Sequence, residues 1–332
     1  RPFKAPQVSV ATYLVTGVAG FIAARTTQLL LDAGHTVIGV DNLNDYYDVR
    51  LKEYRLEQLS GRPNFHFSRT DIEQLVAVES LFVQHKFDAV LNLAARAGVR
   101  YSLENPFVYL ATNAQGTLNL LELMRRYGVK KHIMASSSSL YAGQKMPFNE
   151  ELPVNTPISP YAASKKAAEV MAYSYHHLYG IDSTILRYFT VYGPASRPDM
   201  AHLRFMKWID EGTPLQLFGD GSQSRDFTYV DDIARGTIAA LPLPGYEIIN
   251  LGGGRNPVMI TTIIAKLEIL LGKKANFDRK PIHAGDIRET WADIAKAARL
   301  LGWKPETTLD EGLKLSVEWY RANQSWLKDL KY

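Results

Sequence analysis

With 332 residues, of which 46% are hydrophobic and 22% charged, the chain has an ordinary globular composition and is long enough for two lobes. The formal net charge of +4 comes from scattered basic residues, so nucleic-acid binding is not expected, and the absence of cysteine excludes disulfides, thiolate metal sites and a cysteine nucleophile. The sequence shows no apolar run approaching ~18 residues, no signal-peptide core and no metal-binding histidine motif, so we expect a cytoplasmic protein without a membrane partner or a metal.

The first elements in the chain predict a dinucleotide site. A short β-branched run at residues 8–16 leads into the glycine turn 17–23 and a helix that ends near Gly34. A second apolar run, 36–40, stops at Asp41. Strand, glycine turn, helix, strand and an acidic residue in this order are the layout of a dinucleotide-binding βαβ unit.

Each polar feature of this unit has a physical role. Gly17 would allow the tight turn, and Gly20 would let the backbone approach a pyrophosphate at the positive end of the helix. Asp41 would accept hydrogen bonds from ribose hydroxyls and repel a 2′-phosphate, which favours NAD over NADP. A glycine turn alone is also a common start of a helix, so the flanking strands and Asp41 decide the interpretation.

The alternation of strands and helices continues to about residue 135 and predicts a parallel sheet with crossover helices. The expected strands and helices are 65–67, 73–85, 89–93, 106–127 and 132–135. Ligands of such sheets bind beyond the carboxyl ends of the strands. Asp41, Asp71, residues 93–96 and the serine run 136–139 all follow strands, so we expect them to meet in one cleft.

Tyr161 and Lys165 predict chemistry on an alcohol carbon. Ser159 can cap a helix and Pro160 fits its first position, so both side chains would leave one face of a rigid first turn. Lys165 and the positive ring of an oxidised nicotinamide would lower the tyrosine pKa, and a serine of the preceding run would complete a proton relay. The spacing by itself is common on amphipathic helices, so this interpretation depends on the dinucleotide site.

The second half of the chain is less regular. After a strand at 183–189, we expect a helix at 205–211 and a short strand at 215–218, then a strand at 248–251 and helices at 263–271 and 309–321. The apolar strand at 248–251 suits a return to the main sheet. We therefore predict a doubly wound Rossmann α/β fold with a smaller, interleaved C-terminal lobe. Residues 1–186, joined again by about 228–253, would bind NAD, and residues 187–227 and 254–332 would bind the substrate.

Taken together, the motifs resemble the extended short-chain dehydrogenase/reductase family over nearly the whole chain, and within it the nucleotide-sugar epimerases. The motifs are the turn 17–23, Asp41-Asn42, Asp71-Ile72, residues 93–95, the serines with Tyr141, Tyr161 with Lys165, residues 186–189 with 192–194, residues 225–231 and residues 302–305. Segments 44–47, 96–102 and 197–200 look most like UDP-glucuronate 4-epimerases. Ala23, Asn92 and Ala142 depart from the usual pattern, but none of them replaces a catalytic group.

The resemblance implies a tightly bound NAD that is reduced and reoxidised within one turnover. Tyr161 would take the C4 hydroxyl proton, Lys165 would hold the nicotinamide ribose and tune Tyr161, and Ser137 would share the sugar hydroxyl. The cofactor-binding residues would be Gly17, Gly20, Phe21, Ile22, Asp41, Asn42, Asp71, Ile72, Leu93, Ala94, Ala95, Tyr161, Lys165 and Tyr188. The substrate-binding residues would be Ser138, Ser139, Arg96, Thr190, Arg197, Arg225, Asp286 and Arg288, with Arg225 on the UDP phosphates.

The expected reaction converts UDP-glucuronate to UDP-galacturonate through a 4-keto sugar. That intermediate is a β-keto acid, so the enzyme must hold its carboxylate against decarboxylation; Arg197 is the first candidate, before Arg96 and Arg100. Related dehydratases and decarboxylases carry an acid where this chain has Ser139. A UDP-glucose/UDP-galactose 4-epimerase stays an alternative, although its usual asparagine is Thr190 here.

Two further functions fit these residues less well. A UDP-glucuronate decarboxylase lacks support because of Ser139, and a non-catalytic NAD-binding protein would not need Ser137, Tyr161 and Lys165 together. Helices 106–127 and 161–179 match those that pair two subunits of this family, so we expect a homodimer with a UDP-sugar as substrate.

Overall fold

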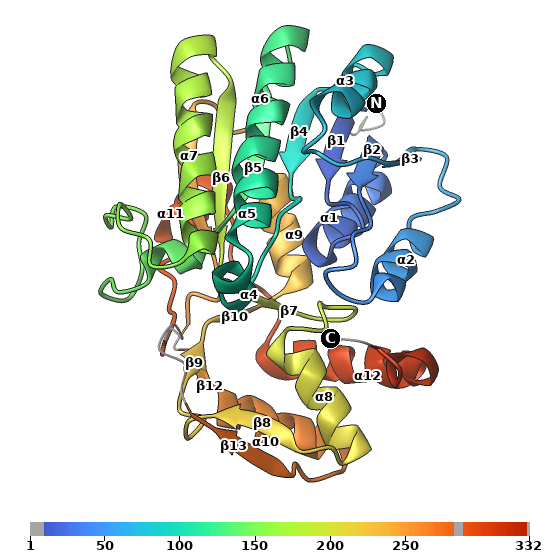
Figure 1. Ribbon diagram of the computed structural model, residues 1–332, viewed down its shortest axis with the longest axis vertical. Helices are drawn as coiled ribbons and strands as arrows, with labels where there is room; N and C mark the ends of the chain where they lie inside the picture. Colours follow the sequence, from blue (N-terminus) through green and yellow to red (C-terminus); the bar gives the residue numbers. More distant parts are fainter. Residues whose placement is uncertain (1–9, 256, 282–287, 331–332) are drawn as a thin grey trace, which may run out of the picture.

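Seven parallel strands form the central sheet of the computed structural model, which describes residues 10–255, 257–281 and 288–330 (Figure 1). Their spatial order is β3-β2-β1-β4-β5-β6-β11, the Rossmann order with one further strand, so the predicted α/β fold is confirmed. The strands are β1 (Thr12–Thr16), β2 (Thr36–Asp41), β3 (Phe65–Arg69), β4 (Ala89–Asn92), β5 (Lys131–Ser137), β6 (Asp182–Tyr188) and β11 (Tyr246–Leu251).

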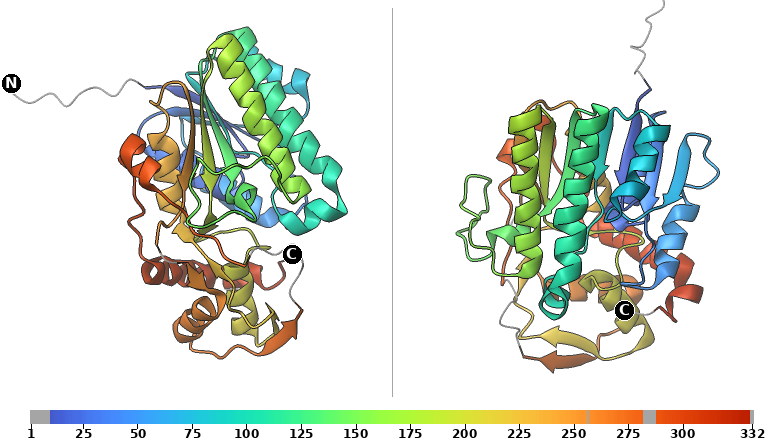
Figure 2. Two further views of the ribbon diagram at one scale, coloured as in Figure 1. Left: turned by 90° about the vertical axis from the view of Figure 1, so that its left-hand side faces the viewer. Right: turned by 45° about the horizontal axis from the view of Figure 1, so that its top comes forward.

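Helices cover both faces of this sheet, as Figure 2 shows in its left view. Alternate residues of one strand point to opposite faces: Leu14 packs with the core of the α3 and α6 side, whereas its neighbour Val15 packs with the core of the α1 side. One face carries α3 (Leu75–Gln84), α6 (Gly116–Tyr127) and α7 (Pro160–Tyr179); the other carries α1 (Phe21–Asp32), α9 (Val230–Ala239) and α11 (Ala295–Leu301).

The predicted helix 106–127 is present but changes its geometry on the way. It begins as α5 (Pro106–Tyr109), passes through a π-helical turn at Leu110–Gln115 and continues as α6. Asn113 is buried inside this turn. π-helical turns of this kind are frequent at functional sites, and this one lies beside the first turns of α7.

Helices α9 and α11 were not expected from the sequence, and neither were two short helices, α2 (Val49–Glu57) and α4 (Val99–Glu104). The Asp48 side chain caps α2 by accepting a hydrogen bond from the Arg50 N–H. The helix carries few apolar residues, so its periodicity is weak, and a single turn such as α4 is too short to show any. Both helices nevertheless place residues at the carboxyl edge of the sheet.

A smaller part of the molecule lies below the sheet in Figure 1 and is built from segments that come before and after β11 in the chain. It contains three strand pairs, β7 with β10, β9 with β12 and β8 with β13. Its elements are β7 (Thr190–Tyr192), α8 (Ala201–Glu211), β8 (Leu215–Phe218), β9 (Ser224–Arg225), β10 (Phe227–Tyr229), β12 (Val258–Met259), α10 (Ile260–Leu271), β13 (Phe277–Lys280) and α12 (Leu309–Leu327). Helix α11, later in the chain, packs back on β11.

Candidate active site

The glycine turn between β1 and α1 presses against the end of β4. Gly17 has φ of 68°, and a Cβ atom built there would lie 2.7 Å from Cα of Ala94, so a side chain would be both strained and obstructed. Gly20 donates its N–H to the Gly17 carbonyl at 2.7 Å and begins α1. The first turn of α1 has neither a side-chain cap nor an acidic residue, which leaves its N–H groups for an anion.

Asp41 is held in place at the end of β2. Its carboxylate accepts hydrogen bonds from the N–H groups of Ala19 at 3.2 Å and Leu43 at 2.8 Å. The Lys52 ammonium lies 4.0 Å away, and burial lowers the pKa of this lysine to about 8 although Asp41 opposes the shift. Lys52 comes from α2, which the sequence reasoning missed; the cap at Asp48 was its available signal. A ribose at Asp41 would therefore also meet a cation.

Asp71 and Ile72 follow β3, the strand next to β2. Asp71 accepts hydrogen bonds from the Asn42 side chain at 2.8 Å and the Glu73 N–H at 2.9 Å. Ile72 packs tightly on Gly116, where an added Cβ would lie 2.6 Å from the isoleucine Cδ1. The residues expected to hold a dinucleotide thus lie on adjacent strand ends with their backbones close together.

Asn92 stands where the family often has histidine, and its environment shows why the change is tolerated. It is buried, accepts a hydrogen bond from the Thr16 hydroxyl at 2.9 Å and donates to the Thr117 hydroxyl at 2.9 Å. Thr16 in turn accepts from the Ala94 N–H at 3.0 Å. The amide therefore ties β1, β4 and α6 together behind the segment 93–95.

Tyr188 faces a different layer from the one its expected role suggests. Its backbone lies opposite Ser137 in the β5–β6 pairing, at the carboxyl edge of the sheet. Its phenol, however, bonds with the Thr237 hydroxyl of α9 at 2.7 Å, and burial raises its pKa. A contact of Tyr188 with a ligand at this edge would therefore use its backbone or ring and not its hydroxyl.

The structure brings Tyr161 and Ser137 together. Ser159 caps α7 by accepting the Ala162 N–H at 3.1 Å, and Pro160 is the first residue of the helix, as expected from the sequence. The Ser137 side chain, at the end of β5, interacts with the Tyr161 phenol and acts to lower its pKa. Ser137 also accepts the Ser139 N–H at 3.1 Å, which fixes the serine turn beneath the phenol.

Burial opposes the charged forms of Tyr161 and Lys165, the two groups expected to act in catalysis. It raises the pKa of Tyr161, while the Ser137 hydrogen bond and the positive charge of Arg197 act to lower it. Burial also lowers the pKa of Lys165 to about 8, against the effect of Glu169, and the ammonium donates to the Ala135 carbonyl at 2.8 Å. The lowered tyrosine pKa expected from the sequence is thus not a property of the chain alone, because desolvation outweighs the favourable charges.

A buried ion pair lies directly behind these groups. Glu169 accepts hydrogen bonds from the Ser136 hydroxyl at 2.6 Å and from two nitrogens of Arg187 at 2.7 and 2.9 Å. Arg187 donates to the Tyr141 hydroxyl at 2.9 Å, and Tyr141 donates to the Asn250 side chain at 2.7 Å. The network joins α7 to the serine strand and to β11. The sequence reasoning missed it, although Glu169 shares the helix face of Lys165.

The three candidate arginines point in different directions. Arg197 pairs with Asp199, with Nε 3.0 Å from the carboxylate, and its charge acts on the Tyr161 phenol. Arg96 donates to the Asn44 side chain at 3.2 Å, on the Asp41 side of the cleft. Arg100 lies over the ring of Phe218 at 4.2 Å, facing β8 of the lower part. Of the three, only Arg197 contributes to the pKa shift of the Tyr161 phenol.

Asn113 of the π-helical turn was not expected from the sequence. Its side chain accepts the Arg96 N–H and donates to the Arg96 carbonyl, both at 2.9 Å. It also donates to the Ser164 hydroxyl of α7 at 2.9 Å. It fixes the segment after β4 against the catalytic helix.

The remaining expected substrate residues fall into two groups. Ser138 and Ser139 begin the 3₁₀ turn that follows Ser137, and Thr190 begins β7. Arg225 donates to the Arg288 carbonyl at 3.2 Å, so these two residues adjoin on the lower part of the molecule. Asp286 lies outside the described residues.

Comparisons with known proteins agree with this arrangement. A model of the NAD-dependent epimerase/dehydratase family matches residues 13–252. The chain is also 58% identical over 319 residues to a UDP-glucuronate 4-epimerase of Thermodesulfobacterium geofontis, covering 96% of this chain and 99% of that protein. The chain belongs to the NAD-dependent epimerase/dehydratase family. The resemblance inferred from its motifs is therefore confirmed.

Solved structures of epimerases share the fold over most of its length. The UDP-glucuronic acid 4-epimerase of Bacillus cereus, in complex with UDP-glucuronic acid and NAD, matches with a TM-score of 0.88 at 38% identity, covering 94% of this chain and 99% of that one. The UDP-glucose 4-epimerase of Thermotoga maritima, with UDP-glucose, matches with a TM-score of 0.86 at 35% identity and the same coverage. As a member of this family the chain uses NAD, and its glycine cradle, bare helix terminus and fixed Asp41 suit that cofactor.

Proposed function

We propose that this enzyme is a UDP-glucuronate 4-epimerase that produces UDP-galacturonate. The observation that carries the proposal is the Tyr161 phenol of α7, whose pKa both the Ser137 side chain at the end of β5 and the charge of Arg197 act to lower. This brings a proton acceptor, a hydroxyl and a cation that could bind a carboxylate to the same part of the cleft. The 58% identity to a UDP-glucuronate 4-epimerase supports the same substrate.

The residues of the cleft have separate roles in the proposed reaction. The glycine turn, Asp41 and Lys165 would hold NAD, which supplies the redox chemistry by taking a hydride from sugar C4 and returning it. Tyr161 takes the proton of the C4 hydroxyl, and the Ser137 hydroxyl keeps the same oxygen in position. After the sugar has turned its other face, Tyr161 returns the proton to the C4 oxygen, which completes the inversion.

Arg197 would decide the fate of the 4-keto sugar. The carboxylate is lost as carbon dioxide when its bond to the ring aligns with the carbonyl π-system. A guanidinium that binds both carboxylate oxygens fixes the plane of the group and prevents that alignment. Ser138, Ser139 and Thr190 can add hydroxyl donors, and an acid at position 139 would repel the carboxylate.

The proposal assigns a role to each lobe. Residues 1–186 and about 228–253 would carry NAD, and residues 187–227 and 254–332 would carry the UDP-sugar, with Arg225 and Arg288 near its phosphates. Among the described residues no helix is long and apolar enough to cross a membrane. A cytoplasmic location and a homodimer stay predictions from the sequence.

Separate incubations with UDP-glucuronate and UDP-glucose test the substrate. We expect UDP-galacturonate from the first, followed by chromatography and proton NMR, and little conversion of the second, because a neutral sugar has no carboxylate for Arg197 to hold. Turnover of UDP-glucose alone would show a neutral-sugar epimerase. Release of carbon dioxide with a UDP-pentose as main product would show a decarboxylase.

Tyr161→Phe tests the mechanism. It removes the proton acceptor and should lower kcat by about 10²- to 10⁴-fold, the usual contribution of a positioned acid or base. NAD content, measured after denaturation of the purified protein, should not change. Tyr127→Phe is the matched control, because this exposed phenol bonds to Glu79 at the far end of α6. Unchanged turnover in Tyr161→Phe would overturn the mechanism.

A further inference from the structure

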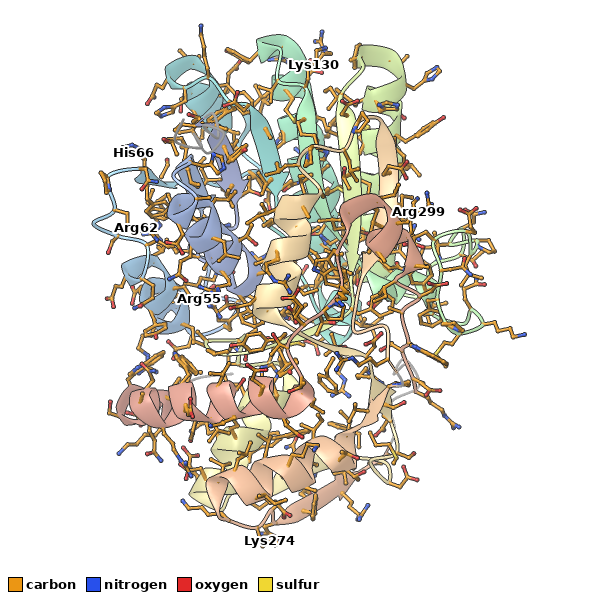
Figure 3. All side chains as sticks on the ribbon, turned by 180° about the vertical axis from the view of Figure 1, so that it is seen from behind. Arg55, Arg62, His66, Lys130, Lys274 and Arg299 are labelled. Atoms are coloured by element: carbon orange, nitrogen blue, oxygen red, sulfur yellow. The ribbon has the colours of Figure 1, made fainter. Side chains whose placement is uncertain are left out.

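Arg55 connects the glycine turn to the loop that precedes Arg197. Its guanidinium donates from Nη1 to the Ala19 carbonyl at 2.9 Å and from Nε to the Ala195 carbonyl at 2.9 Å. Ala19 belongs to the glycine turn, and Ala195 lies two residues before Arg197. The side chain is only 3% exposed, and Figure 3 labels it beside α1 and α2. One buried cation therefore connects the glycine turn to loop 195–197, which we call the arginine loop.

The arginine loop needs such a support. Ala195 has φ of 53°, a left-handed conformation that costs a residue with a Cβ atom free energy. The hydroxyl of the following Ser196 is buried and, within the described part of the chain, makes no hydrogen bond. The bond from Arg55 to the Ala195 carbonyl therefore stabilises a conformation that the loop would not prefer by itself.

Arg55 is itself fixed by the loop that precedes α2. It donates to the Tyr47 hydroxyl at 2.7 Å and lies over the ring of that tyrosine at 5.5 Å. Tyr47 is buried and belongs to segment 44–47, while the supported loop runs into segment 197–200. Both segments carry the resemblance to UDP-glucuronate 4-epimerases. Arg55 thus links two segments that characterise one substrate group.

We infer that Arg55 is a positioning residue: it fixes loop 195–197 against the glycine turn and so fixes the backbone from which the Arg197 side chain enters the cleft. It acts through the loop and touches neither substrate nor reacting atoms. The role of Arg197 toward a carboxylate rests on the proposed function, whereas the fixing of the loop does not. A fixed cation restrains a carboxylate better than a mobile one, because less conformational freedom is lost on binding.

A double-mutant cycle tests this coupling. Arg55→Met should lower kcat/KM for UDP-glucuronate by about 10- to 100-fold, as expected when a binding group is misplaced by about 1 Å, and should raise the share of carbon dioxide among the products. In an Arg197→Met background the same change should have little further effect. Arg50→Met, which removes an arginine of the same helix paired with Asp48, should leave both quantities unchanged. Additive losses would overturn the inference.

A rescue separates positioning from general damage to the fold. Glycine adopts the left-handed conformation without the Cβ penalty, so Ala195→Gly should recover part of the lost kcat/KM in Arg55→Met. If Arg55→Met does not fold, Arg55→Lys retains one donor group and should show a smaller loss of the same kind. No recovery with Ala195→Gly in either background would contradict the proposed route through the loop.

Hydrogen exchange provides a readout that needs no turnover. In Arg55→Met the backbone amides of the non-proline residues within 193–199 should lose protection, whereas the amides of α7 should not. In Arg50→Met the same loop amides should keep their protection. Unchanged protection of 193–199 would overturn the inference even if the enzyme is a UDP-glucuronate 4-epimerase. Lost protection in an enzyme that does not convert UDP-glucuronate would retain the loop support and reject the proposed function.

Discussion

Tyr161 and Lys165 are both held where their charged forms are unfavourable. Burial raises the pKa of the phenol and lowers that of the ammonium to about 8, and the opposing groups Ser137, Arg197 and Glu169 do not reverse either shift. A positively charged ligand ring in the cleft would favour the phenolate. We therefore expect Tyr161 to be a better proton acceptor when such a ligand fills the cleft.

The buried side chain of His202 makes the free energy of unfolding depend on pH. It is 1% exposed on α8, its Nε2 has no hydrogen-bond partner within the described chain, and burial lowers its pKa to about 4 against its hydrogen bond with the Gly193 backbone. An unfolded histidine titrates near ~6.5. Between these values the unfolded chain binds more protons, so the free energy of unfolding falls as the pH falls from 6.5 to 4. The loss from this residue should reach about 2 kcal/mol at pH 5.

His202→Leu should remove that loss. Urea unfolding at pH 7.5 and pH 5.0 would measure it, because the other titrating groups are the same in both proteins and cancel in the difference. The stability of the variant relative to the original chain should rise by about 2 kcal/mol between the two pH values. His66→Leu, at an exposed histidine of β3, is the control and should show no such change. A constant difference for His202→Leu would contradict the role assigned to burial.

At the scale of elements, the glycine turn and α1 form the expected binding site for the cofactor. Gly17→Ala adds a Cβ atom 2.7 Å from the backbone of Ala94 and imposes a left-handed alanine. We expect at least about a tenfold loss of NAD affinity by calorimetry, because the turn must move away from β4 by a distance on the order of 1 Å. A lower free energy of unfolding should accompany it.

Gly128→Ala separates the two causes. Gly128 has φ of 73° at the end of α6, and an added Cβ atom there would meet no atom within 4 Å. It should lose about 1–2 kcal/mol of stability from the left-handed backbone alone and keep its NAD affinity. Equal NAD affinities in Gly17→Ala and Gly128→Ala would show that the close approach at Ala94 is not required.

The helices differ in how clearly their sequences predict them. Helix α7 was predictable because Ser159 and Pro160 mark its start and Gly180 ends it in a left-handed conformation. Helix α2 has its cap at Asp48 but buries Leu51 together with Lys52 and Arg55, so no apolar stripe marks its buried face. Periodicity finds elements that bury apolar residues, and α2 buries charged ones for the site.

At the scale of the whole molecule, the C-terminal helix fastens the lower part to the sheet layer. The Trp319 indole of α12 donates to the Tyr54 hydroxyl of α2 at 2.9 Å, and the Trp326 ring lies 5.5 Å from the Tyr54 ring. Helix α2 thus contacts the C-terminal helix on one side and supplies Lys52 and Arg55 on the other. The positions of Lys52 and Arg55 therefore depend on α12 as well as on α2.

An apolar surface on the α5 and α7 side supports the predicted homodimer. Side chains exposed there are Leu103, Phe107, Leu110, Ile158, Val170, Tyr173 and Leu178, with Phe107 81% exposed. Exposed apolar patches of this kind commonly mark protein interfaces. We expect light scattering at micromolar concentration to give twice the mass of one chain.

Phe107→Glu should convert the dimer to a monomer, because it buries a charge at the contact. Val76→Glu is the matched control: Val76 is 80% exposed on α3, away from this surface, so its variant should stay dimeric. A monomeric original chain, or a Phe107→Glu dimer as stable as the original, would reject this interface.

The sequence by itself determined the parallel sheet and the glycine turn, and it predicted the pair Tyr161 and Lys165. These follow from periodicity, caps and spacing, which depend on residues near each other in the chain, whereas the choice of Ser137 came from the family resemblance. Only the tertiary structure decided that Arg55 bonds to the loop before Arg197, a contact between residues 140 positions apart. Such contacts depend on how whole elements pack, because a buried cation is stable only where distant carbonyl groups are brought to it.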